Sequence, residues 1–328
     1  MTKVLVITGP AGETAGWGGV SETVNMCRAM KDSGRDAEIA FVENMGELHH
    51  ALKEVSYDIV WSALYHISGK SDTIGMGREG HWIADVLEKE NIPYIGPGAA
   101  TMRAVLHKTR THDILEKNGV AVPRHFQVAD NDLLPETVFP VFVKPGYESC
   151  SRGISDKSVV NNTEALRKQV SYIHKAFHQP ALVEEYLPGR EYTVLMLGNG
   201  EQRRFLPGRV EVDQHLFGKY PILGAGLRRK GKIRVSPATH RLEEAKTLAR
   251  RAIDALDCLD HVRLDMRVAA EGRLKIMEFN GMPGLTPVRS LSPKLFSLHH
   301  ASGAGKLEDY RLLIDGIVTS ALARYGMA

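Results

Sequence analysis

Short apolar runs alternate with segments of helical periodicity near the start of the chain. The run from Val4 to Thr8 is followed by a glycine-rich stretch from Gly9 to Gly19, a helical pattern from Ser21 to Ser33 and a second apolar run from Ala37 to Val42. A strand, a helix and another strand in this order are typical of a parallel sheet, in which the helix carries the chain back to the same edge. The pattern predicts an N-terminal parallel α/β domain.

This alternation continues to a group of turn residues near position 98. A strand is expected from Tyr57 to Leu64, a helix from Gly80 to Glu90 and a short strand within Pro93 to Gly98. Prolines and glycines close the last of these segments, as they commonly do at the end of an element. We therefore expect the first domain to span residues 1–98.

The rest of the chain predicts two α+β units, residues 99–180 and residues 181–328. In the first unit, a helical stretch from Thr101 to Asn118 precedes an apolar strand from Val138 to Pro145. The elements expected in the second unit are strands from Ala181 to Tyr186 and from Glu191 to Leu197, a polar loop from Val212 to Ser236, a helix from His240 to Leu256, a hairpin from Val262 to Asn280 and a helix from Leu307 to Tyr325.

The predicted hairpin places two carboxylates opposite one another. Strand alternation puts Asp265 on the same face as Arg263 and Arg267. With the turn at residues 271–272, Asp265 lies across the ladder from Glu278. Facing carboxylates destabilise a sheet unless a cation lies between them.

Asn280 adds a neutral oxygen one step along the return strand from Glu278. Two carboxylates and an amide oxygen form an all-oxygen ligand set, which suits magnesium held jointly with substrate phosphates. The same pattern also fits a solvated strand face on which Arg263 and Arg267 neutralise the acids.

Lys144 ends an apolar strand and is followed by a loop of small residues from Pro145 to Ile154. The backbone N–H groups of such a loop, together with a hydroxyl such as that of Ser151, can face phosphate oxygens while the lysine supplies a positive charge. The loop is not a Walker A motif, because no Gly-Lys-Ser/Thr follows its glycines. An ordinary surface turn is the alternative.

A third segment, from Leu182 to Val194, consists of two strand patterns around the turn at Pro188 and Gly189. Its carboxylates and backbone could bind a ribose and the edge of an adenine. A charged edge of a sheet has the same pattern.

These three segments, in this order, resemble the ATP-grasp superfamily and, within it, the D-alanine–D-alanine ligase group. The resemblance extends from the first strand to about Ser290 and includes the segment Glu-Glu-Tyr-Leu-Pro-Gly-Arg-Glu and the stretch that ends in Glu-Phe-Asn-Gly-Met-Pro-Gly-Leu-Thr. It implies a three-domain ATP-grasp fold, with an N-terminal α/β domain and two lobes that sandwich ATP. It also implies a carboxylate–amine ligase that forms a peptide bond between amino acids through an acyl phosphate.

The resemblance assigns roles to individual residues. Those implied to bind the nucleotide are Lys108 and Lys144 at the phosphates, Glu184, Glu185, Tyr186 and Leu187 at the adenine, and Glu191 at the ribose. Those implied to bind two magnesium ions (or manganese) are Asp265, Glu278 and Asn280. Those implied to take part in catalysis are Arg263 at the acyl phosphate, Ser151 as a hydroxyl donor, and Lys219 with Tyr220 on a closing loop. Those implied to contact the substrates are Glu22 at a substrate ammonium, His66 near the first substrate, and Gly284 and Arg289 near the second.

Several substrate-side positions depart from the family pattern. A segment from Gly12 to Trp17 is inserted before Glu22, Cys150 replaces a serine, and Arg289 stands where the family commonly has a serine. Because of these changes, two alternative functions stay open: a ligase of specialised metabolism with non-alanyl substrates, and a non-catalytic protein that binds a nucleotide. A Rossmann oxidoreductase is a third alternative, but the opening loop lacks a GxGxxG motif.

Composition limits the partners and the cellular location that we expect for the protein. Lysines and arginines number 42 against 39 acids, and they form no basic tract, so nucleic acid is not an expected partner. The three cysteines have no CxxC spacing, which argues against a disulfide framework and against a cysteine zinc site. Neither a signal peptide nor an apolar run of membrane-spanning length is apparent. We expect a cytoplasmic enzyme with amino-acid substrates, no membrane partner and, by family resemblance, a homodimer.

Overall fold

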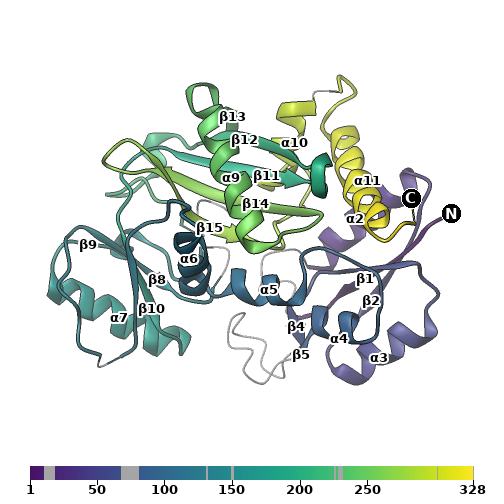
Figure 1. Ribbon diagram of the computed structural model, residues 1–328, viewed down its shortest axis with the longest axis horizontal. Coiled ribbons are helices and arrows are strands. Elements are labelled where there is room, and N and C mark those ends of the chain that lie inside the picture. Colours follow the sequence, from purple (N-terminus) through teal and green to yellow (C-terminus); the bar gives the residue numbers. More distant parts are fainter. Residues whose placement is uncertain are drawn as a thin grey trace.

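The computed structural model describes residues 1–10, 19–67, 81–130, 132–148, 151–224, 227, 232–300 and 302–327. Three larger sheets dominate these residues and lie in separate parts of the molecule (Figure 1). The N-terminal sheet lies at the right of the view, a small sheet with helix α7 lies at the left, and the largest sheet lies between them. This arrangement confirms the predicted combination of a parallel α/β part with α+β parts.

The N-terminal sheet is parallel and has the strand order β2-β1-β3-β6. Its strands are β1 (Lys3–Thr8), β2 (Asp36–Phe41), β3 (Ile59–Ser62) and β6 (Tyr94–Ile95), and its helices are α2 (Val20–Asp32), α3 (Met45–Glu54) and α4 (Ile83–Lys89). Helix α3 was not predicted. A short hairpin of β4 (His66–Ile67) and β5 (His81–Trp82) precedes α4, so the helix begins later than the sequence predicted.

The small sheet is antiparallel and has the order β7-β10-β8-β9, with helix α7 (Thr163–Phe177) packed against it. Its strands are β7 (His125–Val128), β8 (Val141–Pro145), β9 (Val159–Val160) and β10 (Ala181–Glu185). The apolar side chains of α7 recur at helical spacing, which explains why one face of this helix is buried on the sheet. Strand β10 follows the boundary expected at residue 180 and pairs with β8 in this sheet.

The largest sheet is antiparallel and has the order β13-β12-β11-β14-β15. Its strands are β11 (Glu191–Leu197), β12 (Arg204–Glu211), β13 (Arg234–Pro237), β14 (His261–Val268) and β15 (Leu274–Asn280). Helix α9 (Leu242–Leu256) covers one face through alanines and leucines at helical spacing. The opposite face of β11 and β14 carries the polar residues of the predicted site.

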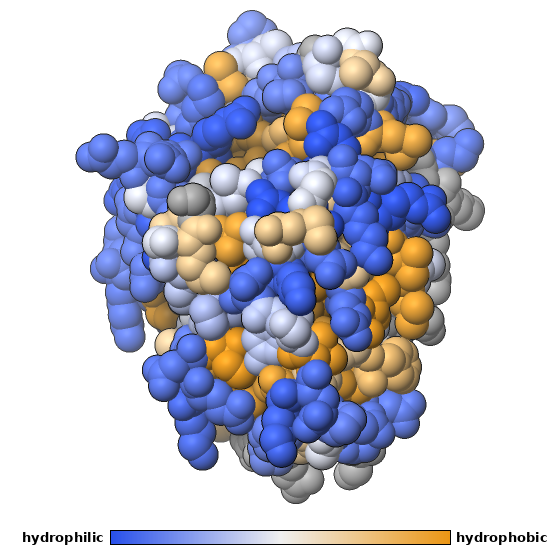
Figure 2. Space-filling model, turned by 90° about the vertical axis from the view of Figure 1, so that its right-hand side faces the viewer, coloured by the Kyte–Doolittle hydropathy of each residue, from blue (hydrophilic) through white to orange (hydrophobic). Residues whose placement is uncertain are grey.

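Two helices follow this sheet and connect it to the N-terminal part. Helix α10 (Leu291–His300) leads to α11 (Lys306–Arg324), which packs against α2, so the two ends of the chain lie on the same side of the molecule (Figure 1). Arg35, in the turn between α2 and β2, pairs with Asp315 of α11 at 2.7 Å. On this side, hydrophobic residues lie in small groups among hydrophilic ones (Figure 2). No helix in the described ranges is both long and apolar enough to span a membrane.

Two predicted elements differ from the structure in ways that affect the site. The single helix expected from Thr101 to Asn118 is divided at His107 into α5 (Ala99–Leu106) and α6 (Lys108–Lys117). The division allows the backbone N–H of Lys108 to donate to the carbonyl of Gly146 in the lysine loop, at 3.1 Å. The last residues of the expected polar loop, from Arg234, form strand β13 instead.

Candidate active site

Two cavities adjoin each other where the small sheet meets the largest one. The smaller has a volume of about 70 Å³, and the larger about 610 Å³. The predicted residues that line the smaller cavity are Lys144, Ser151, Glu184, Glu185, Tyr186, Leu187, Glu191 and Glu278. The structure thus brings residues from the lysine loop, from β10 and from the hairpin to one cavity.

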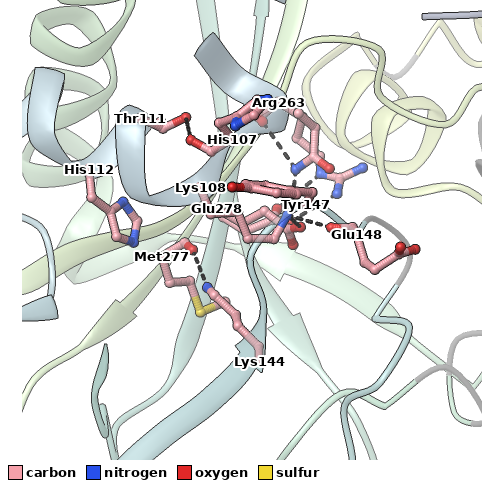
Figure 3. Close-up of polar contacts among 12 residues, drawn as sticks. His107, Lys108, Thr111, His112, Lys144, Tyr147, Glu148, Arg263, Met277 and Glu278 are labelled. Carbon is pink, nitrogen blue, oxygen red and sulfur yellow. Dashed lines mark hydrogen bonds and ion pairs between the residues drawn. The ribbon is translucent and has the colours of Figure 1, made fainter. Parts of the chain in front are cut away.

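A buried charge network forms one wall of the smaller cavity. The Lys144 ammonium lies 2.8 Å from Glu184 and donates to the carbonyl of Met277 at 2.9 Å (Figure 3). The Nε2 atom of His112 is 2.6 Å from the same Glu184 carboxylate oxygen. Burial alone would raise the pKa of Glu184, but the charge of Lys144 and the bonds from His112 outweigh it and lower the pKa to about 2. Burial lowers the pKa of His112, so a neutral imidazole donates to an ionised carboxylate.

This network predicts a pH-dependent contribution to stability. The pKa of Glu184 is about 2 in the folded protein against an ordinary 4.5, so its stabilisation is complete above pH 4.5 and is lost as the pH falls toward 2. The shift corresponds to about 3 kcal/mol. We expect the difference in unfolding free energy between the wild type and Glu184→Gln, measured by urea titration, to shrink by about this amount between pH 5 and pH 2. Exposed Glu201→Gln is the control, and a pH-independent difference for Glu184→Gln would contradict the assignment.

Lys108 is the first residue of α6 and points toward the same region. Its Nζ atom donates to the carbonyl of Glu148 at 2.5 Å and lies 3.3 Å from Glu278. Figure 3 shows Lys108, Glu278 and Arg263 gathered at the start of this helix. Lys108 reaches Glu278 from helix α6, and Lys144 reaches the neighbouring Met277 from strand β8. The two predicted phosphate-binding lysines therefore converge on strand β15.

A buried glutamine holds the start of the lysine loop in place. The backbone N–H of Tyr147 donates to the Gln179 side-chain oxygen at 2.7 Å, and the Gln179 amide donates to the Glu148 carboxylate at 2.8 Å. The carbonyl of Pro180 accepts from the N–H of Gly146 at 3.1 Å. The loop is therefore anchored to the segment between α7 and β10. Ser151 is buried beyond it with a φ of +58°, whereas Cys150 lies outside the described residues.

The hairpin has the predicted register. Asp265 pairs with Glu278 and Arg263 with Asn280, and a β-bulge follows Asp265. Arg263 donates two bonds of 2.9 Å to the Asp265 carboxylate, one to each oxygen. Thr193 donates to Asp265 Oδ1 at 2.7 Å and Asn280 to Oδ2 at 3.2 Å. The Asp265 carboxylate, which has no exposed surface, thus accepts two bonds at each oxygen.

Those residues fit an oxygen-ligated divalent ion that is shared with phosphates. Asp265 and Glu278 face the same side of adjacent strands, and the Asn280 amide lies against Asp265. In the described ranges, no three His, Cys, Asp or Glu side chains group closely enough to hold a metal. Two carboxylates and one amide are the partial ligand set expected when phosphate oxygens complete the coordination of magnesium.

The predicted closing-loop residues line the larger cavity. Lys219 and Tyr220 lie there together with Glu191 and Arg267, and the Lys219 ammonium lies 5.3 Å from the centre of the Tyr220 ring. The Tyr220 ring also makes an edge contact with Tyr186, at 5.8 Å between ring centres. The described part of the loop therefore touches the predicted adenine segment.

The predicted substrate residues lie at the junction with the N-terminal part. Thr286, two residues after Gly284, donates to the Glu22 carboxylate at 3.3 Å, which brings α2 to the loop after β15. His66 is buried on β4, with its ring centre 5.6 Å from that of Trp82. Arg289 is exposed. The inserted segment from Gly12 to Trp17 lies outside the described residues.

Comparison with known proteins decides the family. The sequence pattern of the D-Ala-D-Ala ligase C-terminus matches residues 116–317. The D-alanine–D-alanine ligase of Alcanivorax borkumensis is 31% identical over 255 residues, which cover 76% of each chain. The chain belongs to the D-alanine–D-alanine ligase family. It is an ATP-dependent ligase of the ATP-grasp superfamily, as the sequence motifs predicted.

Solved members of the D-alanine–D-alanine ligase family share the fold along nearly the whole chain. A D-alanine–D-alanine ligase from Bacillus anthracis, solved in complex with ATP, superposes with a TM-score of 0.70 at 20% identity and covers 99% of both chains. The VanG D-Ala:D-Ser ligase of Enterococcus faecalis gives 0.69 at 17% identity, over 98% of this chain and 99% of its own.

Three residues of this ligase site were missed from the sequence. His112 could have been found, because it lies four residues after Lys108 in a predicted helix and so on the same face. Thr193 shares the face of Glu191 on a predicted strand. Gln179 gave no signal, since it reaches the lysine loop from a turn about thirty residues away.

Proposed function

We propose that the protein joins two amino acids, D-alanine to D-alanine in the first instance, with release of ADP and phosphate. The convergence of Lys108, Lys144 and Glu278 beside a cavity lined by β10 carries this proposal. A carboxylate of the first substrate would take the γ-phosphoryl group, and the amine of the second would displace phosphate through a tetrahedral intermediate.

The residues of this chain would act mainly by positioning and charge. The proposed nucleotide-binding residues are Lys108, Lys144, Glu184, Glu185, Tyr186, Leu187 and Glu191, with Ser151 and Lys219 at the phosphates. Arg263, which is 5% exposed, would stabilise negative charge that develops on the acyl phosphate where water is excluded. Glu22 would hold a substrate ammonium, His66 would lie near the first substrate, and Gly284 would border the second.

Asp265, Glu278 and Asn280 would hold magnesium, whether one ion or two, with manganese as a substitute. Magnesium would neutralise phosphate charge. The Asn280 nitrogen donates to Asp265 and to the Arg263 carbonyl. We propose that the Asn280 side-chain amide flips when the ion is bound, so that its oxygen rather than its nitrogen faces the ion. Without a cation, that oxygen would be repelled by the Asp265 carboxylate.

Release of ADP and phosphate tests the proposal directly. The protein would be incubated with Mg-ATP and with D- and L-amino acids, singly and in pairs, and condensed products would be identified by mass. Release with D-alanine alone is the expected result. ATP binding without turnover on any pair would favour the non-catalytic alternative.

A non-alanyl second substrate is the alternative that Arg289 favours. An exposed arginine three residues after Thr286, which contacts Glu22, would add positive charge to the second-substrate site. The structural neighbour VanG is itself a D-Ala:D-Ser ligase. Turnover only with a polar or acidic partner of D-alanine would support this alternative and retain the same mechanism.

We also propose three domains, divided near residue 98 and after strand β10, which pairs within the small sheet and so moves the second boundary past the expected residue 180. We further propose a homodimer and a cytoplasmic location. The free thiols of Cys27 and Cys258, both buried, support a reducing compartment. Light scattering at several protein concentrations would test the dimer.

A further inference from the structure

Arg267 lies on β14, on the same face as Arg263 and Asp265, and has no role in the reaction proposed above. Its side chain is nearly buried and lines both cavities, so it forms part of the wall between them. It makes two bonds to backbone carbonyls: Nε donates to Gly189 at 3.1 Å, and Nη2 donates to Pro221 at 2.9 Å. One guanidinium thus connects two separate segments.

The first of these segments, the turn at Gly189, is held firmly in place by its backbone contacts. Gly189 lies in the turn between β10 and β11, and its N–H donates to the carbonyl of Val268 at 2.9 Å. A Cβ atom at this glycine would approach that carbonyl oxygen to 2.5 Å, so only glycine fits. The turn is therefore held on one side by Val268 and on the other by Arg267.

The second segment belongs to the loop that carries Lys219 and Tyr220. Directly after Pro221, the side chains of Ile222 and Leu223 line the smaller cavity and are nearly buried. That cavity has a volume of only about 70 Å³. Ligand sites for molecules of nucleotide size generally enclose about 300–1,000 Å³. A nucleotide can fill this cavity only after its lining moves, and Ile222 and Leu223 are the lining residues next to the Arg267 contact.

We propose that Arg267 is a positioning residue that latches the Pro221–Leu223 segment against the nucleotide pocket. The inference rests on the proposed function, because it takes the pocket to bind ATP. Displacement of Ile222 and Leu223 requires the bond from Arg267 to Pro221 to break before nucleotide enters. This bond can form only while the pocket is empty, so Arg267 slows association and weakens nucleotide binding.

Arginine suits this role better than lysine. Its planar guanidinium directs several N–H groups at fixed angles and can donate to two carbonyls at once. A lysine at the same position would keep the positive charge but would present a single ammonium, which cannot reproduce both bonds in the same geometry. Methionine would keep much of the side-chain length and remove both bonds.

Stopped-flow fluorescence with N-methylanthraniloyl-ATP and magnesium tests the latch in the full-length protein. We expect Arg267→Met to raise the association rate by about tenfold and to leave the dissociation rate unchanged, as the loss of a free-state bond worth about 1.4 kcal/mol predicts. The Kd for unlabelled ATP, measured by calorimetry, should fall by about tenfold, because the latch stabilises the free state alone. Arg267→Lys should lie between the two.

The control is Arg273→Met, which removes an exposed arginine from the turn of the same hairpin and should leave both rates unchanged. Equal rates in Arg267→Met and the wild type, with ATP bound normally, would overturn the latch alone. A rise in the dissociation rate alone would identify Arg267 as a direct nucleotide contact instead. Failure of the wild type to bind ATP would overturn the proposed function. If Arg267→Met does not fold, as judged by circular dichroism, the rates of Arg267→Lys decide.

Discussion

Glu278→Gln is expected to lower kcat/KM at least a thousandfold while the protein remains folded. Glu278 faces Asp265 across the ladder and lies 3.3 Å from the Lys108 ammonium. Glutamine has nearly the same shape but no charge, so the site would lose one of the two carboxylates proposed to hold magnesium. A thousandfold loss corresponds to about 4 kcal/mol of transition-state stabilisation, a reasonable amount for a charge that helps hold magnesium against phosphates.

Initial rates over a range of magnesium concentrations would measure this effect. We expect the variant to need more magnesium for half-maximal activity as well as to turn over more slowly. Glu271→Gln makes the same chemical change at the turn of the same hairpin, where Glu271 pairs with Lys275 at 3.0 Å, and it should retain activity. Full activity in Glu278→Gln would remove the argument for a metal site at the hairpin.

The hairpin was predictable because its information is local. Alternating apolar positions on two short strands and a Glu-Gly turn fix the register of Asp265 and Glu278. The bulge after Asp265 shifts the pairs beyond it by one residue, which explains why the apolar positions of the two strands did not alternate cleanly. The fold class was predictable for the same reason, since the opening strand, helix and strand specify a parallel sheet.

The interactions between elements were not predictable from these patterns. Nothing in the segment from Thr101 to Asn118 showed a break at His107, because residues on both sides have helical periodicity. The break depends on a bond between Lys108 and Gly146, which is a contact between distant parts of the chain. The sequence likewise gave no sign that Thr193 would donate to the Asp265 carboxylate from strand β11, although it allowed neutralisation of Asp265 by Arg263.

Burial distinguishes the polar face of β14 from the solvated face that its sequence also allowed. Arg263 and Asp265 are 5% and 0% exposed. Exposed ion pairs contribute little to stability, whereas a buried pair is costly to break and is often no more stable than two apolar residues. A buried pair beside the proposed nucleotide pocket is therefore better explained by a role in catalysis than by a role in folding, and this explanation can be tested.

Arg263→Met is expected to lower the unfolding free energy by about 3–5 kcal/mol and to abolish turnover. The substitution removes both 2.9 Å bonds to Asp265 and leaves a carboxylate with no exposed surface. Guanidinium unfolding followed by circular dichroism would measure the loss. Lys168→Met, which breaks the exposed pair with Glu164 on α7, is the control and should cost less than about 0.5 kcal/mol.

The double variant Arg263→Met/Asp265→Leu separates the two roles of the pair. Removing both charges leaves no buried ion without a partner, so we expect the double variant to regain most of the stability lost in Arg263→Met. It should regain no activity, because it lacks both the arginine proposed to stabilise the acyl phosphate and a carboxylate proposed to hold magnesium. If stability were not regained, the pair would contribute directly to folding, and its burial would no longer point to catalysis. If activity returned, neither residue would belong to the active site.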